Sequence, residues 1–349
     1  MLVSGFEVVA VSVNPRQDWA FLRVHTTSPS GSDHLVGLGE VRTGGLVTSV
    51  FCQRAFRCLR EIEVATINRD PCNVECLVGE LLSRDPPSAA GKRVASAVWR
   101  VAVSALESAL WDLAGKIAGL PVYRMLGGGH MPGPCSIRTY ANINRISRDE
   151  HERTPAKFAE YARRAQRDGW SAFKLGPFDG LVSRLENSES AGVQTAIATL
   201  EAVRAAVGEG ADLLVDVHGH FTPEGAVSLR AALEHSQVDL YWIEDACPGP
   251  ESTTFGPRGI PVAEHSEDEG ALGFQWWAQS SSRLSSSSTS SAARVAGGES
   301  LSDPAQALQI LSLPHTFDTL MADIVFVGGI SELRRVGELA AAAGKQVGP

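Results

Sequence analysis

Short runs of apolar and β-branched residues open the chain, and a helical pattern follows them. Residues 6–13, 20–27 and 35–41 are separated by Pro, Asp, Ser and Gly, so they predict a small antiparallel meander. From about 47 to 84 the apolar residues recur every three or four positions, which is typical of helix faces packed on a core. The segment 95–119 predicts the clearest helix of the chain.

A different rhythm begins after residue 130, where short apolar strands alternate with amphipathic helices. The expected strands are 136–143, 171–176, 212–218, 240–245, 294–299, 318–324 and 345–348. The expected helices between them are 154–168, 189–207, 223–235, 303–312 and 330–343. This alternation is typical of parallel βαβ units. The pattern therefore predicts two domains, an α+β capping domain over 1–130 and an α/β domain over 131–349.

The polar residues of the second domain favour a closed barrel over a doubly wound sheet. A polar side chain stands at the carboxyl end of each of five strands, where a (β/α)₈ barrel has its active site: Lys174, Asp216, Glu244, Glu299 and Asp323. The sequence reaches only the seventh strand, so we expect an incomplete TIM-type (β/α)7β barrel with an exposed edge strand. The Ser-rich stretch at about 250–292 has no helical periodicity and predicts an irregular or disordered insert.

Charge and composition exclude several classes of protein. The net charge of −9 argues against a non-specific nucleic-acid binder, which needs a basic face. No apolar run reaches the roughly 20 residues of a membrane span, and the pattern of the first residues predicts a strand rather than a signal peptide. Six scattered cysteines fit no zinc pattern and indicate a cytoplasmic protein with reduced thiols. We expect a homo-oligomer, because an exposed strand edge promotes association.

Three carboxylates on successive strand ends predict a metal site. Asp216, Glu244 and Glu299 end apolar strands, where a lone buried carboxylate is costly. Gathered at one barrel mouth, they would repel one another without a cation among them, and hard oxygen ligands favour Mg²⁺. The alternative is that each acid is a solvated strand end or a helix cap.

These motifs resemble the enolase superfamily, in its mandelate racemase/muconate-lactonizing branch, and within it the acid-sugar dehydratases related to galactonate dehydratase. The similarity covers nearly the whole chain. It rests on the helix ALESALWDLAGKIAGLPVYRMLGG (105–128) and on FKLGPFD, DVHGHF, WIED and GGES at successive strand ends, followed by D-x-x-x-x-G-G from Asp323 to Gly329. The resemblance implies that Asp216, Glu244 and Glu299 bind Mg²⁺ and that the metal holds a substrate carboxylate.

The resemblance also implies roles for individual side chains. A Lys or His base removes the proton next to the substrate carboxylate, and Mg²⁺ stabilises the resulting enediolate as a Lewis acid. His218 matches the histidine that protonates the departing 3-hydroxyl, a task suited to its pKa. Lys174 matches the first lysine of a K-x-K motif, but Gly176 replaces the second, which argues against two-face racemisation and leaves Lys174 to pair with the substrate carboxylate. His220 is either a substrate contact or a solvated loop residue.

The general base is the point at which the chain departs from the family pattern. In relatives an aspartate at the position of Asp323 orients a histidine at the end of strand seven, but strand seven here reads KQVGP. His265 and His315 do not match that motif. Asp323 either belongs to such a catalytic pair or caps a turn.

The sequence therefore predicts an Mg²⁺-dependent carbon–oxygen lyase that converts a sugar acid (an aldonate) to a 2-keto-3-deoxy acid, with no nucleic acid or membrane as partner. From the missing histidine we expect weak or no dehydration by these 349 residues. The alternatives are a non-catalytic remnant, and a one-face epimerase or cycloisomerase that uses the same metal.

Overall fold

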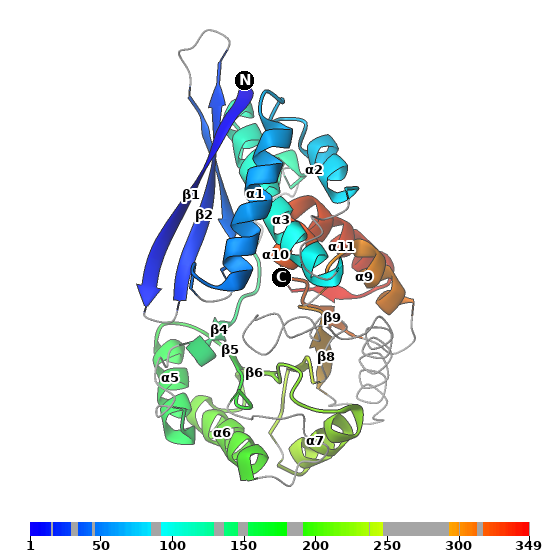
Figure 1. The fold of residues 1–349 in the computed structure, drawn as a ribbon. Helices are drawn as coiled ribbons and strands as arrows, with labels where there is room; N and C mark the ends of the chain where they lie inside the picture. The colour runs from blue at the N-terminus through cyan, green and yellow to red at the C-terminus, as the bar shows by residue number, and fades with distance from the viewer. Residues whose placement is uncertain are drawn as a thin grey trace.

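The computed structural model describes two packed units of the chain (Figure 1). The described residues are 1–14, 17–28, 34–43, 46–84, 92–128, 136–145, 153–179, 191–236, 238–246, 293–299, 301–312 and 317–348. The predicted irregular insert at 250–292 and the predicted boundary near residue 130 lie outside these ranges.

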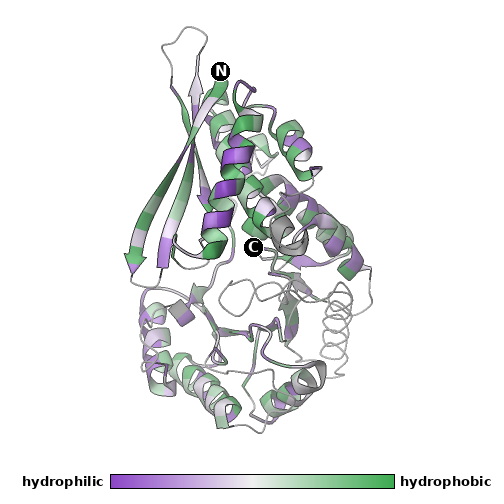
Figure 2. Cartoon of the chain, viewed as in Figure 1, coloured by the Kyte–Doolittle hydropathy of each residue, from purple (hydrophilic) through white to green (hydrophobic). Residues whose placement is uncertain are grey.

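The first unit is an antiparallel sheet covered by helices. Its strands are β1 (Leu2–Asn14), β2 (Gln17–Thr27) and β3 (Val36–Val41), in the order β1-β2-β3. Its helices are α1 (Val50–Thr66), α2 (Val74–Leu82), α3 (Lys92–Ala118) and α4 (Val122–Met125). Hydrophilic and hydrophobic residues alternate along α1, as expected for a helix with one face on the core (Figure 2). The predicted meander and helices are confirmed.

Two glycines allow β3 to lie directly on the backbone of α3. A Cβ atom on Gly37 would come within 2.1 Å of the carbonyl oxygen of Ala109, and one on Gly39 within 1.9 Å of the carbonyl oxygen of Ala105. No side chain fits at such distances, so the close packing of strand on helix depends on both glycines.

No helix in the described part of the chain is both long and apolar enough to cross a membrane.

The second unit is a curved parallel sheet with helices outside it (Figure 1). Its described strands are β4 (Ala141–Asn142), β5 (Ala172–Leu175), β6 (Asp212–Asp216), β7 (Trp242–Glu244), β8 (Arg294–Gly297), β9 (Thr319–Leu320) and β10 (Gln346–Val347), in the order β10-β9-β8-β7-β6-β5-β4. Its helices are α5 (Pro155–Arg167), α6 (Ala191–Val207), α7 (Pro223–Ser236), α9 (Pro304–Leu311), α10 (Ile324–Val327) and α11 (Ile330–Ala342), with a short 3₁₀ helix at Ile143–Arg145. The described residues thus confirm an incomplete parallel barrel with a capping unit.

All seven predicted strands of the second unit are shorter in the structure than expected, and two of them differ most. The strand predicted over 136–143 covers only Ala141–Asn142, and the one predicted over 318–324 covers only Thr319–Leu320. The second prediction was wrong at its end because the Asp323 carboxylate accepts a hydrogen bond from the backbone N–H of Val325 at 2.8 Å, which starts α10 in an apolar run typical of strands.

A buried glutamate joins the two units. Glu107, on α3, accepts hydrogen bonds from the backbone N–H groups of Ile330 and Ser331, both at 2.8 Å, and from the Ser331 hydroxyl at 2.7 Å. The indole of Trp111 donates to the same carboxylate at 2.8 Å. Glu107 therefore caps the first turn of α11 across the contact between the units, and a negative charge at a helix N-terminus is favourable.

Candidate functional site

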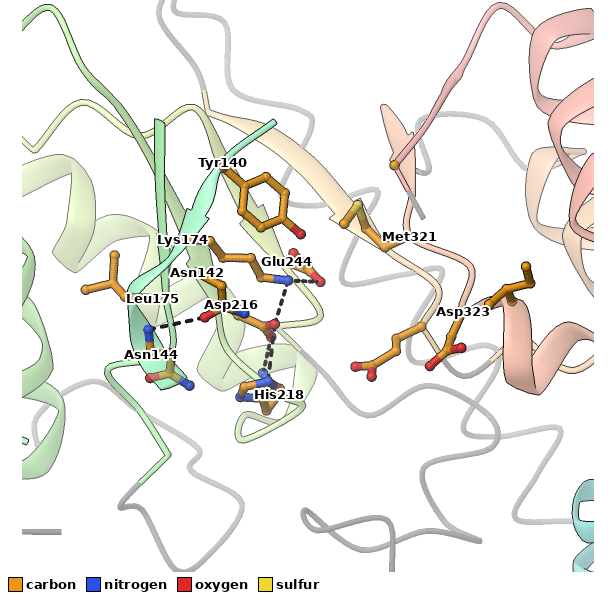
Figure 3. A pocket seen from close by; sticks show the side chains of 14 residues that line it. Tyr140, Asn142, Asn144, Lys174, Leu175, Asp216, His218, Glu244, Met321 and Asp323 are labelled. Carbon is orange, nitrogen blue, oxygen red and sulfur yellow. Dashed lines mark hydrogen bonds and ion pairs between the residues drawn. The ribbon is translucent and has the colours of Figure 1, made fainter. Parts of the chain in front are cut away.

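The candidate site is a cavity at the carboxyl ends of the parallel strands (Figure 3). Its volume is about 340 Å³, and it is lined mainly by polar side chains. Lys174 lies on β5, and Asp216 and Glu244 end β6 and β7, where they are paired in register. Glu299 and Asp323 line the same cavity from positions after β8 and β9. The structure thus brings five predicted site residues to one cavity.

A buried ion triad forms one wall of the cavity. The Nζ atom of Lys174 lies 2.6 Å from Oε1 of Glu244 and 2.9 Å from Oδ2 of Asp216, and all three side chains are buried. Burial alone would lower the pKa of Lys174, but the two carboxylates raise it. Lys174 is therefore a charged residue of the site and not a surface lysine.

The two carboxylates of this triad are in different states. Burial and the negative charge of Asp216 raise the pKa of Glu244. Against its burial, hydrogen bonds from His218 and the charge of Lys174 lower the pKa of Asp216. Glu244 therefore holds a proton more readily than Asp216 does, although both carboxylates contact the same lysine.

His218 connects the triad to a further acid. Its Nε2 atom lies 3.2 Å from Oδ2 of Asp216, and its Nδ1 atom lies 2.5 Å from Oδ1 of Asp179. Its backbone is left-handed (φ 49°), and its N–H donates to Oδ1 of Asp216 at 3.1 Å. Burial alone would lower the pKa of His218, but the two carboxylates raise it to about 11. His218 is thus held at the cavity wall between the carboxylates of Asp179 and Asp216.

The opposite side of the cavity involves an arginine from the capping unit. Arg42 follows β3, and its guanidinium lies 2.6 Å from Oδ2 of Asp323, 3.8 Å from Oε1 of Glu299 and 4.4 Å from the centre of the Phe326 ring. Asp323 also caps α10, as one of the two sequence readings predicted. The side chain of Glu299 is 44% exposed and is held less firmly than Asp216 or Glu244.

His220 was predicted to be either a substrate contact or a solvated loop residue. Its side chain is buried (7% exposed), so the solvated-loop interpretation is wrong. It is absent from the described lining of the cavity, and its role as a substrate contact stays a prediction.

Sequence reasoning missed four polar residues around the site: Arg42, Asn144, Arg153 and Asp179. Asp179 stands in the FKLGPFD segment, where only the lysine had a recognised role. Its carboxylate accepts from the Asn144 amide at 2.7 Å and pairs with Arg153 at 3.2 Å. The partners of Asp179 come from three separate segments, so no local pattern could have indicated them.

The donor set of the cavity fits a hard divalent cation. Within the described ranges no three Asp, Glu, His or Cys side chains converge in the arrangement of a metal site. Asp216 and Glu244 are nevertheless adjacent, and Glu299 lines the same cavity, so oxygen ligands of the kind that Mg²⁺ prefers are available. A cation bound there would offset the mutual repulsion of these carboxylates.

Crowding of these carboxylates makes the stability of the metal-free chain depend on pH. Desolvation and the charges of Asp216 and Glu299 raise the pKa of Asp245 from 3.8 to about 7. The folded state then binds an additional proton between these values, so this group lowers stability by about 1.4 kcal/mol per pH unit as pH rises. The raised pKa of Glu244 acts in the same direction. His218 acts in the same direction above pH 6.5, because its stabilisation is complete below that value and is lost as pH approaches 11.

Urea unfolding in EDTA at pH values from about 5 to 8 measures this dependence. The isosteric variant Asp245→Asn keeps an acceptor for the Gly298 N–H, which lies 3.1 Å from Oδ1, and is expected to flatten the slope below pH 7. An unmodified chain of constant stability over this range, or an unchanged slope in Asp245→Asn, would contradict the prediction.

An open parallel barrel with acids and a lysine at its strand ends, covered by an α+β cap, defines a class of barrel enzymes. Family models give the class its name. "Enolase C-terminal domain-like" matches residues 157–256 and 275–349, and "Mandelate racemase / muconate lactonizing enzyme, N-terminal domain" matches residues 7–127. The chain belongs to the enolase superfamily, in its mandelate racemase/muconate-lactonizing branch, as the sequence motifs predicted.

Individual relatives are dehydratases of sugar acids. The chain is 30% identical over 213 residues to a D-gluconate/D-galactonate dehydratase of Picrophilus torridus. This match covers 61% of this chain and 49% of the relative. The chain is also 25% identical over 344 residues to a D-xylonate dehydratase of Haloferax volcanii. That match covers 96% of this chain and 69% of the relative. The chain therefore spans between about half and about two thirds of these relatives. The crystal structure of a mandelate racemase/muconate lactonizing enzyme from Jannaschia sp. CCS1 is similar in fold, with a TM-score of 0.72 and 25% identity over 99% of this chain and 79% of that one.

Proposed function

We propose that this cavity is the site of an Mg²⁺-dependent dehydratase that takes an aldonate as substrate. The observation that carries the proposal is the continuous contact of Glu244, Lys174, Asp216 and His218 along one wall of a polar cavity. Membership of the superfamily and the sugar-acid dehydratases among the relatives support it. The cavity volume of about 340 Å³ lies within the range typical of small-molecule sites.

Asp216, Glu244 and Glu299 would hold the metal. When bound, Mg²⁺ supplies positive charge to a substrate carboxylate and acidifies the carbon next to it. In this proposal Asp216 and Glu244 are the fixed ligands, since both end strands and are buried. Glu299 would be the third ligand, because its pairing distance of 3.8 Å to Arg42 is long and its side chain is exposed, so it is free to turn toward a metal.

The protein's own side chains orient the substrate and move a proton. Lys174 adds a buried positive charge beside the two carboxylates and assists binding of an anion. His218 donates its proton to the 3-hydroxyl of the aldonate as the C3–O bond breaks, so the hydroxyl leaves as water, after the C2 proton has been removed. The resulting enol rearranges to a 2-keto-3-deoxy acid.

Removal of the C2 proton needs a base, and Asp323 is not paired with one here. Within the described residues its contacts are Arg42 and the N–H of Val325. We therefore expect slow formation of 2-keto acid at most, and ligand binding is the primary test of the site. A cytoplasmic location and self-association stay predictions.

Calorimetric titration tests the proposal. We expect D-gluconate or D-galactonate to bind in Mg²⁺ and not in EDTA, and Glu244→Gln to abolish this Mg²⁺-dependent binding. Glu209→Gln, at a side chain that is 83% exposed and distant in the fold from the cavity lining, is the matched control and should bind as the unmodified chain does. Aldonate binding that is equal in EDTA, or absent in Mg²⁺, would refute the proposed function. Assay of 2-keto acids over a panel of sugar acids then measures turnover.

A further inference from the structure

Asp179 makes the shortest polar contact to His218 and is itself held from the far side. Its Oδ1 atom lies 2.5 Å from Nδ1 of His218. Its Oδ2 atom accepts a hydrogen bond from the Asn144 amide at 2.7 Å and one from the Arg153 guanidinium at 3.2 Å. Both oxygens of Asp179 are therefore occupied, and the carboxylate has one orientation.

Arg153 connects this carboxylate to the strand that carries Lys174. Its guanidinium donates to Oδ1 of Asn144 at 2.8 Å and to the backbone oxygen of Gly176 at 2.7 Å. Its guanidinium also stacks on the ring of Phe158, 5.2 Å from the centre. The support for Asp179 is thus a hydrogen-bond network of three parts: the Asn144 side chain after β4, the Arg153 side chain before α5, and the backbone oxygen of Gly176 after β5.

Gly176 leaves the space that Asp179 fills. A Cβ atom at this position would lie 2.8 Å from Oδ1 and 3.1 Å from Oδ2 of Asp179, and 3.1 Å from the Asn144 amide nitrogen. Such distances are below normal contact, so a side chain at 176 and the observed position of Asp179 exclude each other. The glycine that interrupts the expected K-x-K motif therefore has a physical reason in this chain.

We propose that Asp179 is the positioning residue for His218, and that its carboxylate occupies the space that Gly176 leaves at the end of β5. This inference rests on the proposed function for the role of His218 in expelling the 3-hydroxyl. With Nδ1 bound to Asp179, the imidazole ring presents Nε2 toward Asp216 and the cavity. A carboxylate bound to one imidazole nitrogen fixes both the tautomer and the ring plane, as in other acid–base pairs.

Proton NMR tests the contact without requiring turnover. A proton held in a short hydrogen bond between imidazole and carboxylate resonates far downfield, and His218→Gln assigns the signal by removing it. We expect this signal in the unmodified chain, its loss in Asp179→Asn, and its loss or a large shift in Gly176→Ala.

Two matched variants control for non-specific effects. Asp239→Asn alters an exposed aspartate, and Gly210→Ala adds a methyl group where nothing lies within 4 Å. Both should retain the signal. Absence of the signal from the unmodified chain, or its persistence in Asp179→Asn, would overturn the assignment of Asp179.

Kinetics separate positioning from structural support. Where the chain forms 2-keto acid, Asp179→Asn should lower kcat by about 10- to 100-fold and change KM by less than about 2-fold, because a misplaced His218 loses part of the roughly 10²–10⁴-fold that general acid catalysis supplies. Asp179→Glu should recover part of kcat. A fall in stability with kcat unchanged would assign Asp179 a structural role only. If the unmodified chain binds no aldonate, the proposed function fails, while the NMR signal still decides whether Asp179 holds His218.

Discussion

Replacing Lys174 by methionine is expected to destabilise the metal-free chain by about 3–5 kcal/mol. Lys174 is the shared partner of two buried carboxylates, at 2.6 and 2.9 Å. Methionine keeps most of the volume but leaves Glu244 without its ion-pair partner and Asp216 with His218 alone. Urea unfolding in EDTA measures the loss.

Magnesium should reverse a large part of this loss. The ammonium group and a divalent cation neutralise the same carboxylates, so Mg²⁺ is expected to stabilise Lys174→Met more than the unmodified chain. Lys157→Met, at an exposed lysine that pairs with Glu160 at 3.0 Å, is the control and should cost less than about 1 kcal/mol. If Mg²⁺ raised the stability of both chains equally, the carboxylates would not be its ligands.

Truncation of Glu107 to alanine is expected to lower the free energy of unfolding by about 2–4 kcal/mol. The change leaves the N–H groups of Ile330 and Ser331 without their carboxylate acceptor in a buried contact. Each unsatisfied buried donor costs about 1–3 kcal/mol. Chemical denaturation followed by tryptophan fluorescence reports the effect, since Trp111 donates to the same carboxylate.

Two further variants show whether capping of α11 is the cause. Glu107→Gln retains an acceptor oxygen and should cost less than Glu107→Ala. Glu201→Ala, on the exposed face of α6, should change stability by less than about 0.5 kcal/mol. Equal stabilities of Glu107→Ala and Glu201→Ala would show that this interface glutamate does not cap the helix.

Periodicity alone predicted most of the architecture. The meander and the alternation of strands and helices follow local rules, because each buried face repeats at a fixed spacing. The end of β9 did not follow these rules. The run from Ile324 to Val327 is apolar, and three of its four residues are β-branched, yet the Asp323 cap and the left-handed Gly328 enclose a turn of helix there. A capping contact of one side chain thus overcame the propensity of four residues.

The site was predictable where it depends on strand ends and not where it depends on contacts across loops. Lys174, Asp216 and Glu244 stand on adjacent strands, so register alone brings them together. Arg42 meets Asp323 across 281 positions of sequence, and Asp179 meets His218 across 39. Contacts of this kind depend on how two chain segments pack, which no periodic pattern encodes.

The glycine-dependent packing of β3 on α3 also has a consequence for chimeric proteins. Arg42 directly follows β3. The close packing at Gly37 and Gly39 fixes the position of this strand, and therefore how far the Arg42 side chain lies from Glu299 and Asp323. A hybrid that takes its first 128 residues from another family member would place the residue at position 42 at a different distance from Glu299 and Asp323. Such hybrids should keep the pairing with Glu299 and Asp323 only where the distance between the donor's third strand and its long helix matches the distance between β3 and α3 here.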